Sequence, residues 1–291
     1  MVTLAEPQLT LFGRSTPRSQ FLKWVGNKYR YAGLIADYIP IDYRCYFEPF
    51  VGSGPVLATI APPRGVAGDV LKPLIEIWEL LKADPDRLLE HYRRTWNEYI
   101  TSPKQVYERV RDCFNAEPNG PDLLFLCRSC YGGIVRFTRG GAMSTPVGPH
   151  RAIRPESLAE RISAWRDRVS HTDFVCADFE ETMGRAGAYD VVYCDPPYLF
   201  SQPILYGAQE FAVDRLWTAI ERCKTRGAKV LLSLDGMKKS GRVFTDIDVP
   251  AGLFEREVLV DCGGSMLRRF QKRGENMRGE RVHDRLMMTW R

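Results

Sequence analysis

The stretch Asp190-Val-Val-Tyr-Cys-Asp195-Pro196-Pro197-Tyr198 decides the fold and points to one site. Residues 191–194 form a short apolar run, which predicts a buried strand of an α/β sheet. The run ends in a carboxylate, two prolines and an aromatic ring. Open parallel sheets place their ligands beyond the carboxyl ends of the strands, so this tetrapeptide is expected to line a ligand site.

The chemistry of the tetrapeptide favours a planar base with an exocyclic amino group. Prolines fix φ and lack an N–H, which makes the loop stiff and leaves its carbonyl groups free to accept hydrogen bonds. Asp195 and the carbonyl of Pro196 can together accept both hydrogens of an amino group, while Tyr198 offers a face for stacking. The simpler alternative is that the prolines only end the strand and Tyr198 packs in the core.

The rest of the chain alternates strands and helices around a helical middle. A chain of 291 residues can form one large domain with a sizeable insertion. The pattern predicts a parallel-sheet α/β core with a mostly helical insertion, and no internal repeat. We predict a flexible arm at 1–18, a core at 19–74 and 166–291, and an insertion at 75–165. Expected strands lie at 45–49, 65–69, 173–177, 191–194, 228–234, 255–260 and 286–290. A helix is expected to follow the basic-aromatic segment 21–28 and to end near Ile39, and further helices are expected at 75–82, 85–99, 103–114, 121–130, 155–169 and 214–226.

A glycine turn follows the first predicted strand. Gly52 and Gly54, after Phe50, allow a sharp turn and a close approach of the backbone to a ligand. A dinucleotide fingerprint requires a third glycine where Leu57 stands, and a phosphate-binding loop requires a Gly-Lys-Ser/Thr sequence that is absent here. The turn therefore fits a small adenosine-bearing ligand that lacks a pyrophosphate.

Acidic residues end the next strands. Asp69 stands where a carboxylate would hold ribose hydroxyls. Asp178 and Phe179 can place a carboxylate on an adenine amino group and a ring against the adenine face. Each signal is weak alone, but their order along the chain strengthens them together.

These motifs resemble those of adenine-specific DNA methyltransferases of the Dam-like, DPPY-type class. The resemblance covers nearly the whole chain from about residue 20, in the order that this class shows. It rests on Lys23-Trp24-x-Gly26-x-Lys28, Phe50-x-Gly52-x-Gly54, Gly68-Asp69, Asp178-Phe179, Asp195-Pro-Pro-Tyr198 and the DNA-facing segment 130–137. The resemblance implies a Rossmann-like methyltransferase sheet whose inserted domain recognises the DNA target.

The resemblance also implies the reaction and its residues. S-adenosylmethionine would donate a methyl group to the N6 amino group of an adenine flipped out of duplex DNA. No metal is needed, and the chain shows only one Cys-x-x-Cys pair, Cys127 and Cys130. The implied catalytic residues are Asp195, Pro196, Pro197 and Tyr198, and the implied cofactor-binding residues are Trp24, Lys28, Phe50, Gly52, Gly54, Asp69, Asp178, Phe179 and Asp195.

Three alternatives remain open at this stage. The same geometry serves the amino group of cytosine, although a serine in place of Asp195 is commoner in cytosine-N4 enzymes. A catalytically silent DNA-binding module is opposed by the intact tetrapeptide. A nicotinamide-dependent oxidoreductase is opposed by the missing third glycine.

Basic residues in two regions are candidates for DNA contact. From Gly264 to the end, eight Lys or Arg residues face three acidic ones, a difference that equals the net charge of +5. The candidates are Arg128, Tyr131, Arg136 and Arg139 in the insertion and Arg268, Arg269, Lys272 and Arg273 in the tail. Gly132, Pro149 and His150 depart from members that modify GATC, so the target sequence is left open.

The N-terminal arm carries Gln8-Leu9-Thr10-Leu11-Phe12, which resembles the peptides that dock bacterial proteins on the replication sliding clamp. The alternative is that these apolar residues pack on the core. The chain has no apolar stretch long enough to cross a bilayer, no secretory pattern in its first twenty residues, and eight scattered cysteines. We therefore expect a cytoplasmic protein with double-stranded DNA as its partner.

Overall fold

The computed structural model describes residues 13–197, 211–238, 243–244, 247–264 and 281–291. Its centre is a mixed sheet with the strand order β3-β2-β1-β4-β5-β8-β7, and β6 pairs with β5. The strands are β1 (Tyr46–Glu48), β2 (Gly65–Asp69), β3 (Thr172–Cys176), β4 (Val191–Cys194), β5 (Lys229–Lys238), β6 (Val243–Phe244), β7 (Arg256–Gly264) and β8 (Arg281–Met288).

Strand direction divides the sheet into two parts. The first five strands in chain order, β1 to β5, run parallel, as the alternating pattern predicts. β8 lies antiparallel between β5 and β7, so the sheet is not parallel throughout. The short helices α2 (Pro55–Ile60) and α8 (Phe179–Gly184) escape a search for helical periodicity, because six residues make fewer than two turns.

Both faces of the sheet are covered, because side chains of successive strand residues point to opposite faces. On β4, Val191 and Tyr193 join the core under α1 (Ala32–Asp37) and α2, whereas Val192 and Cys194 join the core under α8 and α9 (Val213–Thr225). The near-continuous apolar sequence of β4 is thus a consequence of burial on both sides.

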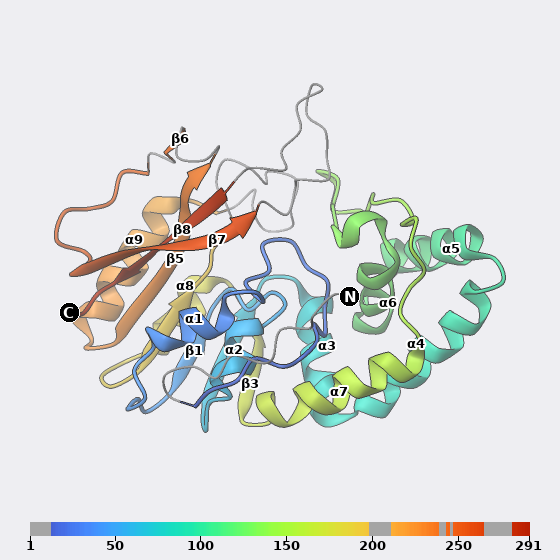
Figure 1. Cartoon of the computed structure of the whole chain (residues 1–291), viewed down its shortest axis with the longest axis horizontal. Coiled ribbons are helices and arrows are strands. Elements are labelled where there is room, and N and C mark those ends of the chain that lie inside the picture. Colours follow the sequence, from blue (N-terminus) through green and yellow to red (C-terminus); the bar gives the residue numbers. More distant parts are fainter. Residues whose placement is uncertain (1–12, 198–210, 239–242, 245–246, 265–280) are drawn as a thin grey trace.

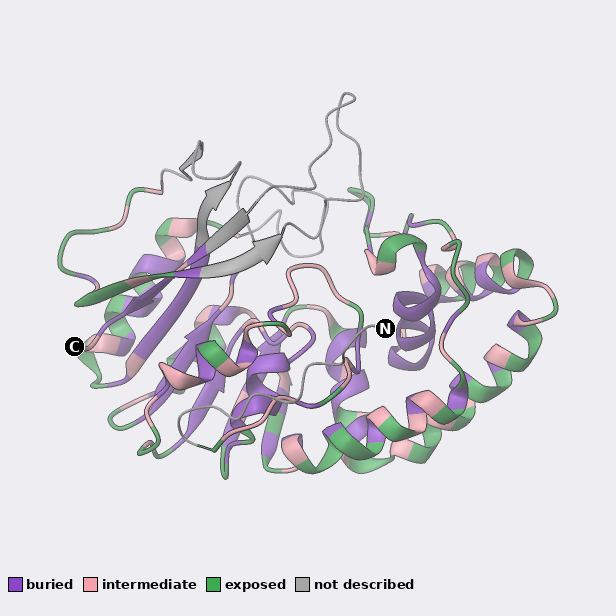
Figure 2. Ribbon diagram, in the orientation of Figure 1, coloured by how far each residue is buried: buried purple, intermediate pink, exposed green. Residues whose placement is uncertain are grey.

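The helical insertion lies to one side of the sheet (Figure 1). Residues 70–171, all of them described, form α3 (Lys72–Ala83), α4 (Pro85–Tyr99), α5 (Pro103–Ala116), α6 (Gly120–Ser129), the 3-10 helix η1 (Tyr131–Gly133) and α7 (Pro155–Val169). α6 is buried along its whole length, whereas α4 and α5 expose one face (Figure 2). No helix in the described ranges has both the length and the apolar character needed to cross a bilayer.

Helices α6 and α7 fasten the extended segment that leads into the core. Trp165 donates from its indole N–H to the carbonyl of Ser19 at 2.8 Å, and Arg161 donates to the carbonyl of Gln20 at 3.0 Å. Arg168 donates to the carbonyl of Ser15. Residues 15–21, called the strap below, therefore obtain several hydrogen-bond donors from the insertion.

Arg128 also donates hydrogen bonds to the strap, although the sequence analysis expects it to contact DNA. Its side chain is 8% exposed, and its Nε donates to the carbonyl of Phe21 at 3.0 Å. A second nitrogen, Nη2, donates to the carbonyls of Gln20 and Phe21. Burial lowers the pKa of Arg128 to about 10, so the group is still charged at neutral pH. Arg128 thus ties α6 to the strap and does not face solvent.

Candidate active site

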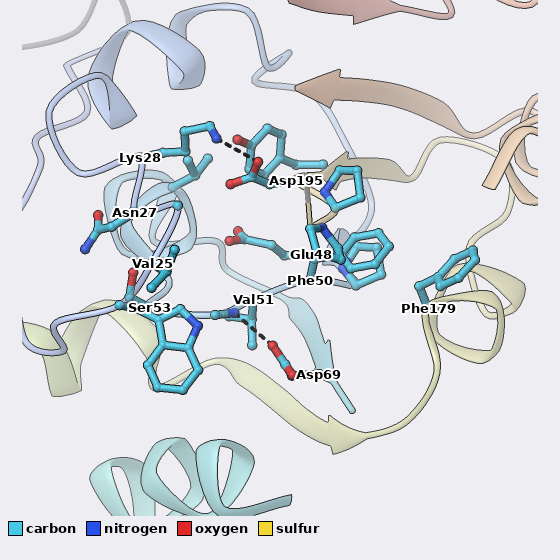
Figure 3. Close-up of a pocket in the computed structure, with 18 of the residues that line it drawn as sticks. Val25, Asn27, Lys28, Glu48, Phe50, Val51, Ser53, Asp69, Phe179 and Asp195 are labelled. Atoms are coloured by element: carbon cyan, nitrogen blue, oxygen red, sulfur yellow. Dashed lines mark hydrogen bonds and ion pairs between the residues drawn. The ribbon is translucent and has the colours of Figure 1, made fainter. Parts of the chain in front are cut away.

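One pocket lies at the carboxyl ends of β1 and β4, two neighbouring strands whose following helices cover opposite faces of the sheet (Figure 3). Ligands of doubly wound sheets bind at such a switch point. Most of the expected catalytic and cofactor-binding residues line this pocket. They are Trp24, Lys28, Phe50, Gly52, Asp69, Asp178, Phe179, Asp195, Pro196 and Pro197.

The floor of the pocket is the glycine turn between β1 and α2. Gly52 has φ +47° and Gly54 has φ +58°, the left-handed region that favours glycine. A Cβ atom on Gly52 would lie 3.3 Å from the Trp24 ring, and one on Gly54 would lie 3.0 Å from Trp78. Gly54 precedes α2 and packs behind the turn, outside the residues that line the pocket.

Asp69 fixes this turn in place. Its two carboxylate oxygens accept hydrogen bonds from the backbone N–H of Gly52 at 3.2 Å and of Leu71 at 3.1 Å (Figure 3). Trp78 donates from its indole N–H to the carbonyl of Gly52 at 3.1 Å. The acid that ends β2 therefore holds the turn that follows β1.

Aromatic rings form one wall. Phe50 stacks on Phe179 with ring centroids 5.2 Å apart and planes inclined by 26°. Phe211, which the sequence analysis did not single out, lies 6.0 Å from Phe50 and 5.7 Å from Phe179. Such a wall offers flat apolar surface to a planar ring system.

Asp178 carries an unforeseen partner. Its Oδ1 accepts a hydrogen bond from Arg215 at 2.8 Å and from the backbone N–H of Glu180 at 2.9 Å. Arg215 also pairs with the Glu180 carboxylate at 2.6 Å and lies 5.0 Å from the Phe179 ring centroid. The two residues expected near an adenine ring are thus held by α9.

Asp195 faces the pocket and forms an ion pair with Lys28. The Lys28 Nζ lies 2.8 Å from Asp195 Oδ1 (Figure 3). It also lies 3.6 Å from Asp284 Oδ2. The Lys28 side chain is 3% exposed, while that of Asp195 is 19% exposed. Lys28, expected to touch the cofactor, therefore contacts the expected catalytic carboxylate.

Glu48, at the end of β1, is the acidic residue of this site that the sequence analysis missed. Figure 3 shows its carboxyl group facing the same space as Asp195. Burial is the main cause that raises the pKa of Glu48 to about 8. A hydrogen bond of 2.6 Å from the Tyr46 hydroxyl acts against burial, and the nearby Asp195 acts in the same direction as burial. The carboxyl group of Glu48 is therefore mostly neutral at pH 7.

Helix α5 anchors residues 143–145, and Met143 pairs with Phe137 of the segment 130–137 that is expected to face DNA. Tyr107 donates to the carbonyl of Thr145 at 2.7 Å, and Asn115 bonds to both the N–H and the carbonyl of Met143. Tyr131, Arg136 and Arg139 are exposed around this segment. The expected site residues Tyr198, Arg268, Arg269, Lys272 and Arg273 lie outside the described residues.

The raised pKa of Glu48 generates a prediction for stability against pH. The folded state keeps a proton that the unfolded chain loses above about pH 4.5, so folded stability falls as pH rises from there to about 8. The fall contributed by Glu48 is about 1.4 kcal/mol per pH unit. Glu48→Gln should remove it, making the variant progressively more stable than the natural protein towards pH 8.

Urea unfolding at several pH values between about 5 and 8 measures this difference. Glu90→Gln, on an exposed position of α4, is the matched control and should leave the pH dependence unchanged. Parallel curves for Glu48→Gln and the natural protein would contradict the burial of an uncharged carboxyl group.

Comparison with known proteins identifies relatives of this chain. Residues 24–260 match the family of D12 class N6 adenine-specific DNA methyltransferases. The DNA adenine methylase of Vibrio cholerae serotype O1 is 29% identical over 225 residues, which cover 73% of this chain and 80% of the relative. That of Serratia marcescens is 32% identical over 182 residues, 61% of this chain and 66% of the relative. Type II methyltransferase M.MjaIII of Methanocaldococcus jannaschii is 28% identical over 274 residues, 84% of this chain and 93% of the relative.

The family match extends over most of the chain and includes the glycine turn, the acid at the end of β2 and the Asp-Pro-Pro sequence after β4. It confirms the resemblance and, with it, the use of S-adenosylmethionine. The protein belongs to the D12 class of N6 adenine-specific DNA methyltransferases.

Proposed function

We propose that Asp195 and the carbonyl of Pro196 hold the amino group of a flipped-out adenine beside the methyl donor. The observation that supports this most is that one pocket is lined both by the glycine turn after β1 and by Asp195, Pro196 and Pro197 after β4. A ligand on the turn and a base at the tetrapeptide would therefore be neighbours.

The pocket residues fit S-adenosylmethionine. The close approach of the backbone at Gly52, the buried carboxylate of Asp69 and the Phe50–Phe179 pair suit an adenosine group. Carboxylates and rings also favour a positively charged sulfonium. When bound, this group supplies an electrophilic methyl carbon.

The amino group of adenine is a poor nucleophile, because its lone pair is delocalised into the ring. Hydrogen bonds to Asp195 and the Pro196 carbonyl favour a tetrahedral nitrogen whose lone pair points at the methyl carbon. S-adenosylmethionine would supply the methyl group, and the electron pair of the broken C–S bond would stay on its sulfur. N6 would then carry a positive charge, which Asp195 would stabilise, and would give up one proton through that carboxylate to water.

We assign target recognition to the insertion, predicted at 75–165, and DNA contact to its exposed residues Tyr131, Arg136 and Arg139. These residues surround a segment that α5 holds firmly. We also propose that the enzyme works in the cytoplasm, where its DNA is.

Replacing the catalytic carboxylate provides the first test. Asp195→Ala should reduce turnover by more than about a hundredfold, because the variant loses both the acceptor and the charge that stabilises N6. Lys28 keeps Asp284 as a partner, so folding and most DNA binding should persist. Methylation of duplex DNA by radiolabelled cofactor measures the effect, and a residual turnover of one tenth would remove Asp195 from this role.

A second test separates DNA contacts from internal ones. Arg136→Ala and Arg139→Ala should each weaken DNA binding and reduce the slope of log K against log salt by about 0.9, with little change in stability. Arg128→Ala should instead leave the salt dependence of DNA binding unchanged and lower the free energy of unfolding by about 1–3 kcal/mol, because carbonyl groups of the strap lose their hydrogen-bond donor. Salt titrations and urea unfolding of the three variants distinguish the two roles, and a reversed pattern would contradict this assignment.

The sequence Gln8–Phe12 lies outside the described residues, and we propose it as a clamp-docking peptide on sequence grounds. Deletion of residues 1–12 retains Ser15, whose carbonyl bonds to Arg168. The truncated enzyme should fold and methylate free DNA normally but lose binding to purified sliding clamp in a titration. Unchanged clamp affinity would refute the proposal.

A further inference from the structure

Lys28 lies between two carboxylates that come from different strands. Asp195 follows β4, and Asp284 belongs to β8, where it is 4% exposed. Their oxygens lie 2.8 Å and 3.6 Å from the Lys28 Nζ. Asp284 does not line the pocket, so it has no direct access to a ligand there.

The antiparallel strand β8 explains why an acid reaches this position. Leu286 and Met288 face the same core as Tyr193, and side chains two residues apart on a strand share a face. Asp284 therefore points to the face of the sheet on which Lys28 lies. A carboxylate this deeply buried requires a compensating charge, and Lys28 supplies it.

The charges of the three groups have a consequence for the reaction. An ammonium at 2.8 Å from Asp195 offsets the negative potential that should stabilise a positive N6. A second carboxylate beside the ammonium, that of Asp284, restores a net negative charge to the group of three. It also helps to hold the ammonium in place beside Asp195 Oδ1.

We propose that Asp284 is a positioning residue for methyl transfer, acting through Lys28 on the orientation and field of Asp195. This inference rests on the role proposed for Asp195. It assigns the C-terminal strand a part in catalysis besides closing the sheet.

The experiment compares Asp284→Asn, which removes the charge at constant size, with Asp284→Glu, which keeps it. Asp284→Asn should lower kcat by about tenfold or more while the KM for S-adenosylmethionine changes by less than about threefold. Asp284→Glu should recover a large part of the loss. Glu257→Gln is the matched control: Glu257 pairs with Arg285 at 2.7 Å on the neighbouring strand, and its loss should leave kcat unchanged.

A double-mutant cycle tests whether the effect passes through Lys28. In a Lys28→Met background, Asp284→Asn should have less than about a twofold effect on kcat, because the group it acts on is gone. Thermal unfolding of each variant separates a kinetic effect from lost stability. If Asp284→Asn does not fold, Asp284→Glu carries the test. A kcat lowered more than about twofold at unchanged cofactor KM, and not lowered by the same change in the Lys28→Met background, supports the proposal. A kcat within about twofold of the natural enzyme, or a drop in kcat that persists in the Lys28→Met background, overturns it.

Other outcomes would also overturn it. The first is a kcat for Asp284→Asn within twofold of that of the natural enzyme. The second is an equal decrease in kcat for the Asn and Glu variants, in proportion to the decrease in their melting temperatures. The third is additivity of the effects of the Lys28 and Asp284 substitutions on kcat. Failure of the role of Asp195 is recognised separately, since it would appear as turnover retained by Asp195→Ala.

Discussion

The site depends on the topological switch between β1 and β4. The chain leaves β1 for α2 on one face of the sheet and approaches β5 through α9 on the other. The two carboxyl ends thus lie side by side with their following segments diverging, which leaves room for ligands between them. The Gly52 turn occupies one end and Asp195 the other. The two motifs lie far apart in the sequence, and the parallel pairing of β1 with β4 brings them together.

The charge balance of the pocket depends on the partner that each of its acidic side chains has. Asp195 is balanced by Lys28, and Asp69 by backbone N–H groups of the glycine turn. Glu48 has a buried carboxyl group with a raised pKa, and it accepts a hydrogen bond from the Tyr46 hydroxyl. A cation bound nearby would favour the charged form of Glu48, so the site is suited to a positively charged sulfonium group.

The sequence predicts the features that depend on neighbouring residues, and it misses the contacts between residues that lie far apart in the chain. The strand ends, the glycine turn and the family motifs follow from short patterns, and parallel pairing explains why they share one pocket. Arg128 was assigned to DNA because it is basic and precedes a glycine-rich segment. Its partners lie 107 and 108 residues away, and no local pattern shows that it is buried. Arg215 and Asp284 were missed for the same reason: each joins the site through tertiary contacts of α9 or β8.

The strap gives the insertion a physical connection to the pocket. Arg128 and Arg161 hold the carbonyls of residues 20–21, and the chain then passes directly into Trp24 and Lys28. The same helix α6 that carries Arg128 ends where the segment expected to face DNA begins. Arg128 thus lies in the last turn of the helix, next to that segment, and it bonds to the strap that leads to Lys28 and its contact with Asp195. The insertion is therefore joined to the pocket by side-chain hydrogen bonds to the strap, in addition to the chain connections at its two ends.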